Sequence, residues 1–147
     1  GDIGFIKSKS DNVRVVDTKK ENKLIVHFTD KLPTDVSADF MAQVDADSRI
    51  ASSRNHTATH LLHEGLRNIL GDHVAQKGSL VNPNYLRFDF SHFEKIAPED
   101  LQKIENLVNE KIRENIAKIE SRNIPIKKAK IKDFFISIIT NLSLIYA

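Results

Sequence analysis

The stretch "RNHTATHLLHEGL", residues 54–66, decides the fold of the second half of this 147-residue chain. Its apolar residues recur at spacings of three and four, and the pattern continues to residue 70, as expected for one side of a helix. The residues on that side are Ala58, Leu61, Leu62, Gly65, Leu66 and Ile69. Asn55 is predicted to cap the N-terminus, and Gly71 is typical of a helix end. The sequence therefore predicts an amphipathic helix over residues 54–70.

The polar side of this helix is rich in histidine. On a helical wheel with about 100° per residue, four polar side chains fall within a sector of about 40°. This sector lies nearly opposite the apolar stripe. The four side chains are His56, His60, His63 and Arg67. Spacing alone leaves two interpretations open. One is a solvated polar face, and the other is a metal site that uses two imidazoles one turn apart.

A metal site at this position needs at least a third protein ligand. The chain has no cysteine, so His63, His73, His92 or a carboxylate would have to serve. The zinc-protease signature is absent, because Thr57 stands where that signature has its general base. No nucleophile-elbow sequence supports a serine hydrolase.

Residues 1–47 are predicted to form strands. "VRVVDT" (13–18) and "KLIVHF" (23–28) are β-branched runs, and "GDIGFIKS" (1–8) and "DFMAQVDA" (39–46) show partial alternation. Four short strands in so short a segment predict a small β-barrel over residues 1–50.

Two further strands are predicted after the histidine helix. "KGSLV" (77–81) and "LRFDFSHF" (86–93) are joined by the turn-forming "NPN". In the second strand the apolar residues alternate with polar ones, which predicts one buried face.

A long helix is predicted from Pro98 to about Arg122, because proline suits the first helical position and an apolar stripe follows. The stripe consists of Leu101, Ile104, Val108, Ile112, Ile116 and Ile119. Pro125 would stop this helix, and "IPIKKAKIKDF" (124–134) would form another short strand. The predicted fold class is α+β, with a small N-terminal β-barrel followed by an antiparallel sheet packed with two main helices.

Composition sets broad limits on function. With 40% hydrophobic and 29% charged residues, the chain is typical of a globular protein. A formal charge of +2 does not demand a nucleic-acid partner, although lysines cluster near both ends. Two interpretations of these lysine clusters stay open: they form a solvated surface, or they contact phosphate groups. The start has no signal-peptide pattern. The apolar stretch at 134–147 is shorter than the roughly 20 residues of a membrane span, so we expect a core segment or sequence foreign to the fold.

The histidine helix, "AQKGSLV" (75–81) and "LRFDFSH" (86–92) occur in one order and spacing that resemble the editing region of bacterial alanyl-tRNA synthetases. Editing domains of threonyl-tRNA synthetases and free-standing alanyl editing proteins share the shorter His-x-x-x-His core. The resemblance is strongest over residues 54–115. Residues 1–50 look like the small β-barrel that precedes the editing core in the alanyl enzymes.

This resemblance implies hydrolysis of serine or glycine wrongly attached to alanine tRNA. Family members hold zinc with two histidines and with a later Cys-x-x-x-His motif, and His56 and His60 match the first pair. Thr59 and Gln76 match positions that shape the amino-acid pocket, and we assign them as catalytic-site residues. A zinc-held or pocket-held water would attack the ester.

The same resemblance implies a tRNA partner, with Lys77 and Arg87 as predicted contacts, and a cytoplasmic location. ATP and Mg²⁺ would serve only the parent enzyme, and the oligomeric state stays open. The alternatives are a tRNA-binding module without chemistry and an inert structural fragment.

The end of the chain departs from the family pattern. The Cys-x-x-x-His motif is missing, and "KIKDFFISIITNLSLIYA" (130–147) replaces the expected glycine-rich segment. We expect a truncated or out-of-frame end. The predicted domains are the barrel at 1–50, an incomplete editing domain at 51–130 and an atypical apolar tail at 131–147. The isolated chain is predicted to be inactive, because two ligands do not complete a zinc site.

Overall fold

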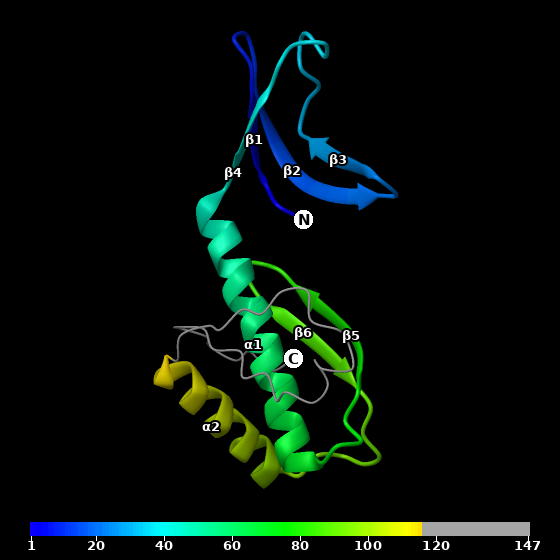
Figure 1. The fold of residues 1–147 in the computed structure, drawn as a ribbon, viewed down its shortest axis with the longest axis vertical. Coiled ribbons are helices and arrows are strands. Elements are labelled where there is room, and N and C mark those ends of the chain that lie inside the picture. The colour runs from blue at the N-terminus through cyan, green and yellow to red at the C-terminus, as the bar shows by residue number, and fades with distance from the viewer. Residues whose placement is uncertain (116–147) are drawn as a thin grey trace, which may run out of the picture. The chain divides into compact units, whose positions relative to one another are not determined.

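The computed structural model describes residues 1–115, which fall into two compact units (Figure 1). The first unit is Gly1–Ala51, and the second begins at Ser52. Several predictions lie outside the described residues: the stripe residues Ile116 and Ile119, Pro125 and the strand at 124–134, and the tail at 131–147.

The first unit is a four-stranded antiparallel sheet with the order β3-β2-β1-β4. Its strands are β1 (Gly4–Lys7), β2 (Asn12–Glu21), β3 (Leu24–Thr29) and β4 (Met41–Val44). The four strands predicted from alternation and β-branching are therefore confirmed. Strand β2 continues through Lys19 and Lys20 to Glu21, and the turn follows at residues 22–23.

The predicted closure of these strands into a small β-barrel is wrong. Strands β3 and β4 are the two edges of the sheet, and no pairing joins them within residues 1–115. A barrel requires hydrogen bonds between its first and last strands. Strand β4 is only four residues long and is exposed throughout. The buried apolar side chains of this unit are Val13 and Val15 alone, so the sheet encloses little core.

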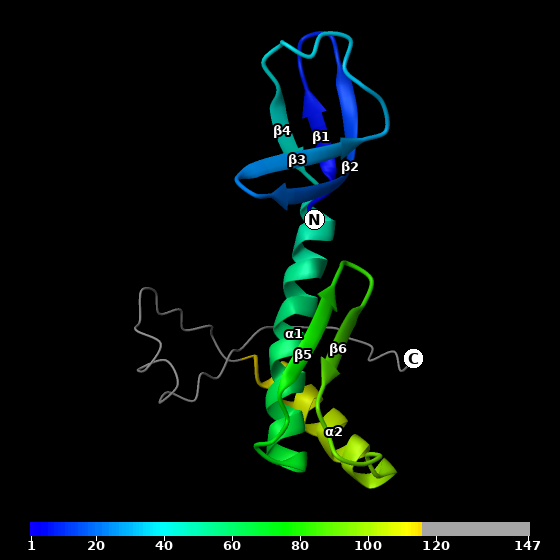
Figure 2. The same ribbon diagram turned by 90° about the vertical axis from the view of Figure 1, so that its right-hand side faces the viewer.

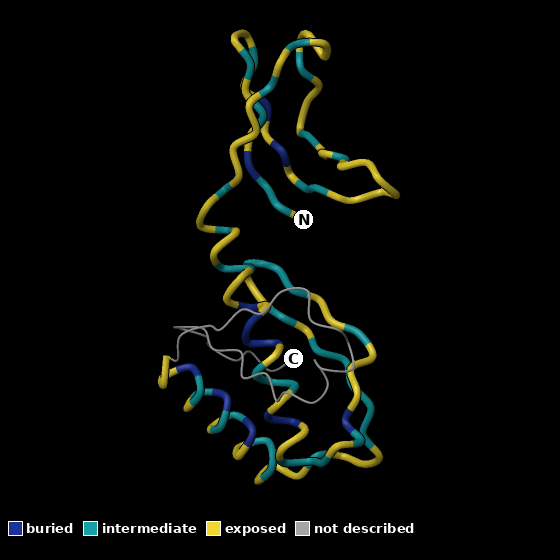
Figure 3. Tube along the Cα trace, in the orientation of Figure 1, coloured by how far each residue is buried: buried dark blue, intermediate teal, exposed yellow. Residues whose placement is uncertain are grey.

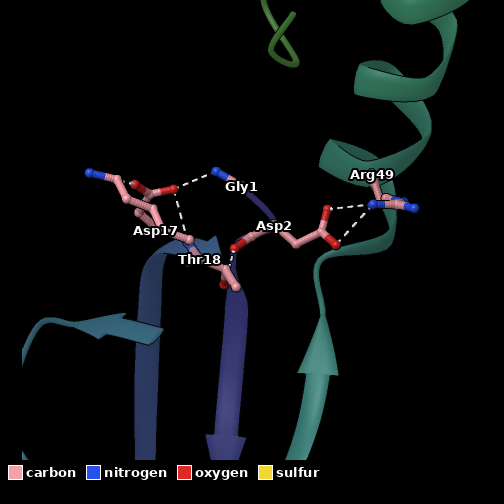
Figure 4. Close-up of polar contacts among 6 residues, drawn as sticks. Gly1, Asp2, Asp17, Thr18 and Arg49 are labelled. Carbon is pink, nitrogen blue, oxygen red and sulfur yellow. Dashed lines mark hydrogen bonds and ion pairs between the residues drawn. The ribbon is translucent and has the colours of Figure 1, made fainter. Parts of the chain in front are cut away.

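Polar contacts tie the N-terminal residues to the sheet and to the helix that follows it (Figure 4). Nη1 of Arg49 donates to both carboxylate oxygens of Asp2, at 3.0 and 2.9 Å. The hydroxyl of Thr18 donates to the carbonyl oxygen of Asp2 at 2.8 Å. The Gly1 amino group pairs with the carboxylate of Asp17 and lowers the pKa of that carboxyl. Asp2, Asp17 and Thr18 are only partly buried and Arg49 is exposed, so water screens the ion pairs and each contributes little to stability.

Helix α1 (Ala46–Leu70) begins well before the predicted start at residue 54. Asp45 is its N-cap: Oδ1 accepts a hydrogen bond from the Ser48 backbone N–H at 2.8 Å, and its carbonyl accepts from the Arg49 N–H at 3.0 Å. The bond from Ser48 lowers the pKa of Asp45. The prediction of Asn55 as N-cap is therefore wrong, because Asn55 lies inside the helix.

The second unit combines the part of α1 from Ser52 onward with a hairpin and a second helix (Figure 2). The hairpin strands β5 (Gln76–Val81) and β6 (Leu86–Phe90) are antiparallel, and α2 (Pro98–Glu114) follows them. An α+β fold with two helices and antiparallel sheets is thus confirmed. Gly71 follows the last residue of α1, as predicted, and has a positive φ of 111°.

The core of the second unit lies between α1, α2 and the hairpin. Its buried members are Leu66, Val74, Ile104, Val108 and Ile112. Phe88 and Phe90 of β6 are partly buried and pack against them, so the predicted buried face of that strand is only partly covered. The buried residues of α2 recur along one side of the helix, as its apolar stripe predicts (Figure 3).

Helix α2 ends at Glu114, and Asn115 takes the left-handed conformation with φ 47° and ψ 42°. The prediction of one continuous helix from Pro98 to about Arg122 is therefore wrong, because the left-handed backbone of Asn115 ends α2. Among the residues described, neither helix carries the apolar run that a bilayer-spanning segment requires.

Candidate functional site

His56 and His60 lie one turn apart on α1 and are exposed. Their ring centroids are 4.9 Å apart, with an angle of 63° between the ring planes. The helix places these two imidazoles on a common face because its 3.6-residue period brings residues i and i+4 together. Two imidazole rings therefore lie next to each other on this face.

The protonation state of His60 suits a ligand. Partial burial of its ring, and then the charges of His56 and His63, lower the pKa of His60 from its ordinary value of 6.5. The neutral imidazole is the form that coordinates a metal ion or accepts a proton. The cluster therefore favours an available lone pair on His60 at neutral pH.

His63 does not share the solvated face that the wheel predicts for it. Its ring lies 5.1 Å from that of Phe88 on β6, and its Nε2 atom is buried without a hydrogen-bond partner. The wheel considers α1 alone, whereas the hairpin packs beside the helix and covers part of its polar side. Arg67, the fourth member of that face, is exposed and pairs with Asp72 at 2.8 Å.

His73 and His92, which were considered as third ligands, contact each other instead. Nε2 of His73 and Nδ1 of His92 are 2.8 Å apart, so one ring donates a hydrogen bond to the other. Within residues 1–115 no group of three or more His, Asp or Glu side chains is placed to hold a metal ion. The described part of the chain thus supplies a pair of candidate ligands.

Thr59 lies beside His60 in sequence but is buried. Its hydroxyl donates to the Asn55 carbonyl oxygen at 2.9 Å, and Thr57 makes the same type of bond to Ser53 at 3.2 Å. Both hydroxyls are satisfied by the helix backbone. Thr59 therefore supports the turn that carries the second histidine.

The remaining predicted site residues lie on the hairpin and are exposed. Nε2 of Gln76 donates to the hydroxyl of Ser79 at 3.1 Å. Nε of Arg87 pairs with the carboxylate of Asp89 at 3.1 Å. Lys77 has no hydrogen bond or ion pair within the described residues. No contact between these hairpin side chains and the histidine pair is seen in residues 1–115.

Sequence reasoning missed the structural role of Asn55. This residue is 5% exposed, and its Nδ2 donates to the carbonyl oxygens of Asn82 and Pro83 at 2.7 and 3.3 Å. It joins α1 to the hairpin turn one residue before His56. The sequence signal for this role is an asparagine directly before the histidine face, although the same residue type is also typical of a helix N-cap.

Comparison with known proteins relates the chain, rather than the site itself, to named enzymes. Over 130 residues the chain is 56% identical to an alanine–tRNA ligase of Bacteroides fragilis and 55% identical to that of Bacteroides thetaiotaomicron. The chain is homologous to part of an alanine–tRNA ligase. Each of these matches covers 88% of this chain, and the chain spans about 15% of the length of the relatives. An alanine–tRNA ligase of Cytophaga hutchinsonii is 52% identical over the same length. No family model matches the chain.

Proposed function

We propose that this segment of an alanyl-tRNA synthetase is its editing segment, which hydrolyses serine or glycine wrongly attached to alanine tRNA. The observation that carries the proposal is the exposed His56–His60 pair on a chain homologous to alanine–tRNA ligases. A binding pocket alone discriminates weakly between amino acids that differ by one small group. A second, hydrolytic site is therefore the physical route to high fidelity.

The donor chemistry fits part of a zinc site. Two imidazoles, one of them with a pKa lowered by partial burial and by neighbouring histidines, are suitable zinc ligands. A bound zinc ion would act as a Lewis acid toward water or the ester. The described residues add no third ligand, so we propose that the chain forms half of the site and is inactive alone.

The other proposed residues position the substrate. Thr59 holds the turn around His60 through its bond to Asn55 and shapes the amino-acid pocket. Gln76 presents an amide whose Nε2 is oriented by Ser79, so its carbonyl oxygen can accept a hydrogen bond from a serine hydroxyl. Lys77 and Arg87 place positive charge on the same hairpin, which suits contacts with the tRNA backbone.

The metal part of the proposal is tested by zinc stoichiometry. The full chain is dialysed against zinc and the bound metal is measured. If the pair binds zinc without the missing motif, the bound metal should be lost in His60→Ala and kept in His27→Ala, which removes an exposed histidine of β3. Zinc retained by His60→Ala would contradict the assignment of this pair, whereas a parent chain without zinc would mean that the site needs the missing Cys-x-x-x-His motif.

The editing function is tested in a chimaera. The chain replaces the matching segment of the Bacteroides fragilis alanine–tRNA ligase, from the first to the last aligned residue. We expect the chimaera to hydrolyse serine-charged alanine tRNA, and His60→Ala to abolish this hydrolysis without changing alanine attachment. Equal hydrolysis with and without His60 would overturn the proposal.

A tRNA-binding role without chemistry is the second candidate. Lys7 lies over the ring of Phe5 at 5.9 Å, and Lys19 over that of Phe28 at 5.0 Å, all on the first unit. Basic groups interleaved with exposed aromatics suit an RNA backbone and its bases. This role predicts salt-sensitive tRNA binding that survives His60→Ala. A chain with neither tRNA binding nor zinc binding would be an inert fragment.

A further inference from the structure

Phe93 is the most exposed large hydrophobic side chain among the described residues, at 85%. Its ring is nevertheless supported from one side. The centroids of the Phe93 and His73 rings are 4.5 Å apart, and their planes differ by 24°. One ring face is therefore stacked on an imidazole, while the side chain as a whole remains open to solvent.

The support beneath Phe93 is well held. His73 is hydrogen-bonded to His92 at 2.8 Å, and these two rings are also stacked, with planes 20° apart. The segments that carry them are joined by the backbone bond from Ser91 to Ala75, at 3.0 Å. Gly71 leaves room for His73, since a Cβ there would approach its Nδ1 to 3.1 Å. Two imidazoles and their backbone thus fix the plane on which Phe93 rests.

The surroundings of Phe93 are polar. Its chain neighbours are His92 and the exposed Glu94, followed by the exposed Lys95. His92, Glu94 and Lys95 also line a cavity of about 300 Å³ whose apolar wall includes Ile69. Lys95 has no hydrogen bond or ion pair within the described residues. A docking site for an apolar protein surface would need a contiguous apolar patch, which these neighbours interrupt.

We infer that Phe93 is a stacking platform for an unpaired base of tRNA, with Lys95 beside it for a backbone phosphate. The inference rests on the proposed function, which supplies the tRNA partner. Every base has a flat π-face, and a supported, exposed ring presents the complementary surface without dependence on sequence. A neighbouring lysine and polar cavity suit the phosphate and the base edges that a stacked nucleotide would bring with it.

The test uses the full 147-residue chain and alanine tRNA that carries 2-aminopurine at the unpaired 3′ end. Stacking on Phe93 should quench the probe. We expect Phe93→Ala to abolish the quenching and to weaken binding by about five- to 150-fold, while Phe93→Trp restores both. Tyr85→Ala, which removes another exposed aromatic of the same unit, is the matched control and should leave the quenching in place.

Salt dependence separates stacking from charge. Phe93→Ala should leave the slope of log affinity against log salt unchanged, whereas Lys95→Ala should reduce it by about one. Far-UV circular dichroism checks that each variant is folded.

The outcomes distinguish this inference from the proposed function. If the chain binds tRNA and Phe93→Ala changes neither quenching nor affinity, the platform is overturned and the editing proposal stands. If the parent chain binds no tRNA even at low salt, the platform is overturned too, and the chimaera separately decides the editing function.

Discussion

At the scale of single residues, His60 shows how neighbours set the chemistry of an exposed imidazole. Its pKa is lowered by partial burial and by the charges of His56 and His63. We expect an NMR titration to place the pKa of His60 below 6.5 and to show it rising in His56→Gln, because one repulsive charge is removed. An unchanged pKa in that variant would mean that His56 does not act on His60.

The same shift has a consequence for stability. Because the pKa of His60 is lower in the folded chain than in the unfolded one, the unfolded chain binds more protons below about pH 6.5. Stability is therefore lost as pH falls from 6.5 through the folded pKa. Urea unfolding at pH 7.5 and pH 5.0 should show a smaller loss in His60→Gln than in the parent chain. His27→Gln, on the first unit, is the control for removing a histidine elsewhere.

Asn55 is the second residue whose role depends on its partners. Asn55→Ala would leave the Asn82 carbonyl without its donor at a nearly buried site, so we expect a loss of about 1–3 kcal/mol in the free energy of unfolding. Asn68→Ala, at an exposed position of the same helix, should change stability much less. Equal effects of the two substitutions in urea unfolding would contradict the role assigned to Asn55.

At the scale of elements, the start of α1 depends on one carboxylate. Asp45→Ala removes the acceptor for the Ser48 N–H, so we expect a lower thermal midpoint and frayed amides in the first turn. Asp45→Asn should retain most of the cap because its side chain also accepts this bond. Asp47→Ala tests charge without the cap, since Asp47 lies in the same turn. If the first-turn amides frayed in Asp47→Ala but not in Asp45→Ala, Asp45 would not be the N-cap of α1.

The contact between α1 and α2 depends on a small residue. A Cβ at Gly65 would lie 3.4 Å from Cγ2 of Val108 and 3.6 Å from Cγ2 of Ile104, which leaves room for a methyl group at most. We expect Gly65→Leu to cost about 1–3 kcal/mol of stability through overpacking, and Gly65→Ala to be much milder. The measurement is urea unfolding followed by circular dichroism. Equal stability of the two variants would show that the helices are not in close contact there.

At the scale of the whole molecule, the two units differ in how much apolar surface they bury. The first unit buries only Val13 and Val15, whereas the second has a continuous cluster that includes Leu66 and Val108. We expect amides of β1–β4 to exchange with solvent faster than those of α2, because protection follows local burial and packing. Exchange measured by mass spectrometry tests this. Slower exchange in β1–β4 than in α2 would contradict the comparison.

The sequence by itself determined which strands and helices form and the shared face of His56 and His60, but not where α1 begins. Periods of 2 and 3.6 residues are local properties, so the six strands and both helices could be identified from the order of apolar residues. The Gly71 helix end and the partly buried face of β6 follow from the same local rules. Metal binding by the histidine pair and the catalytic-site roles of Thr59 and Gln76 stay predictions.

Only the tertiary structure decided which predicted groups meet. The open edges of the first sheet, the contact of His63 with Phe88 and the pairing of His73 with His92 all depend on residues far apart in sequence. Asn55 was expected to cap the helix, but it bonds to the hairpin turn, which the local sequence could not predict. A helical wheel describes one helix and cannot predict which strand packs against it. An alternation pattern describes one strand and cannot predict which strand pairs with it. Contacts between strands and helices are set by tertiary packing. The predictions made from local sequence patterns therefore fail at these contacts.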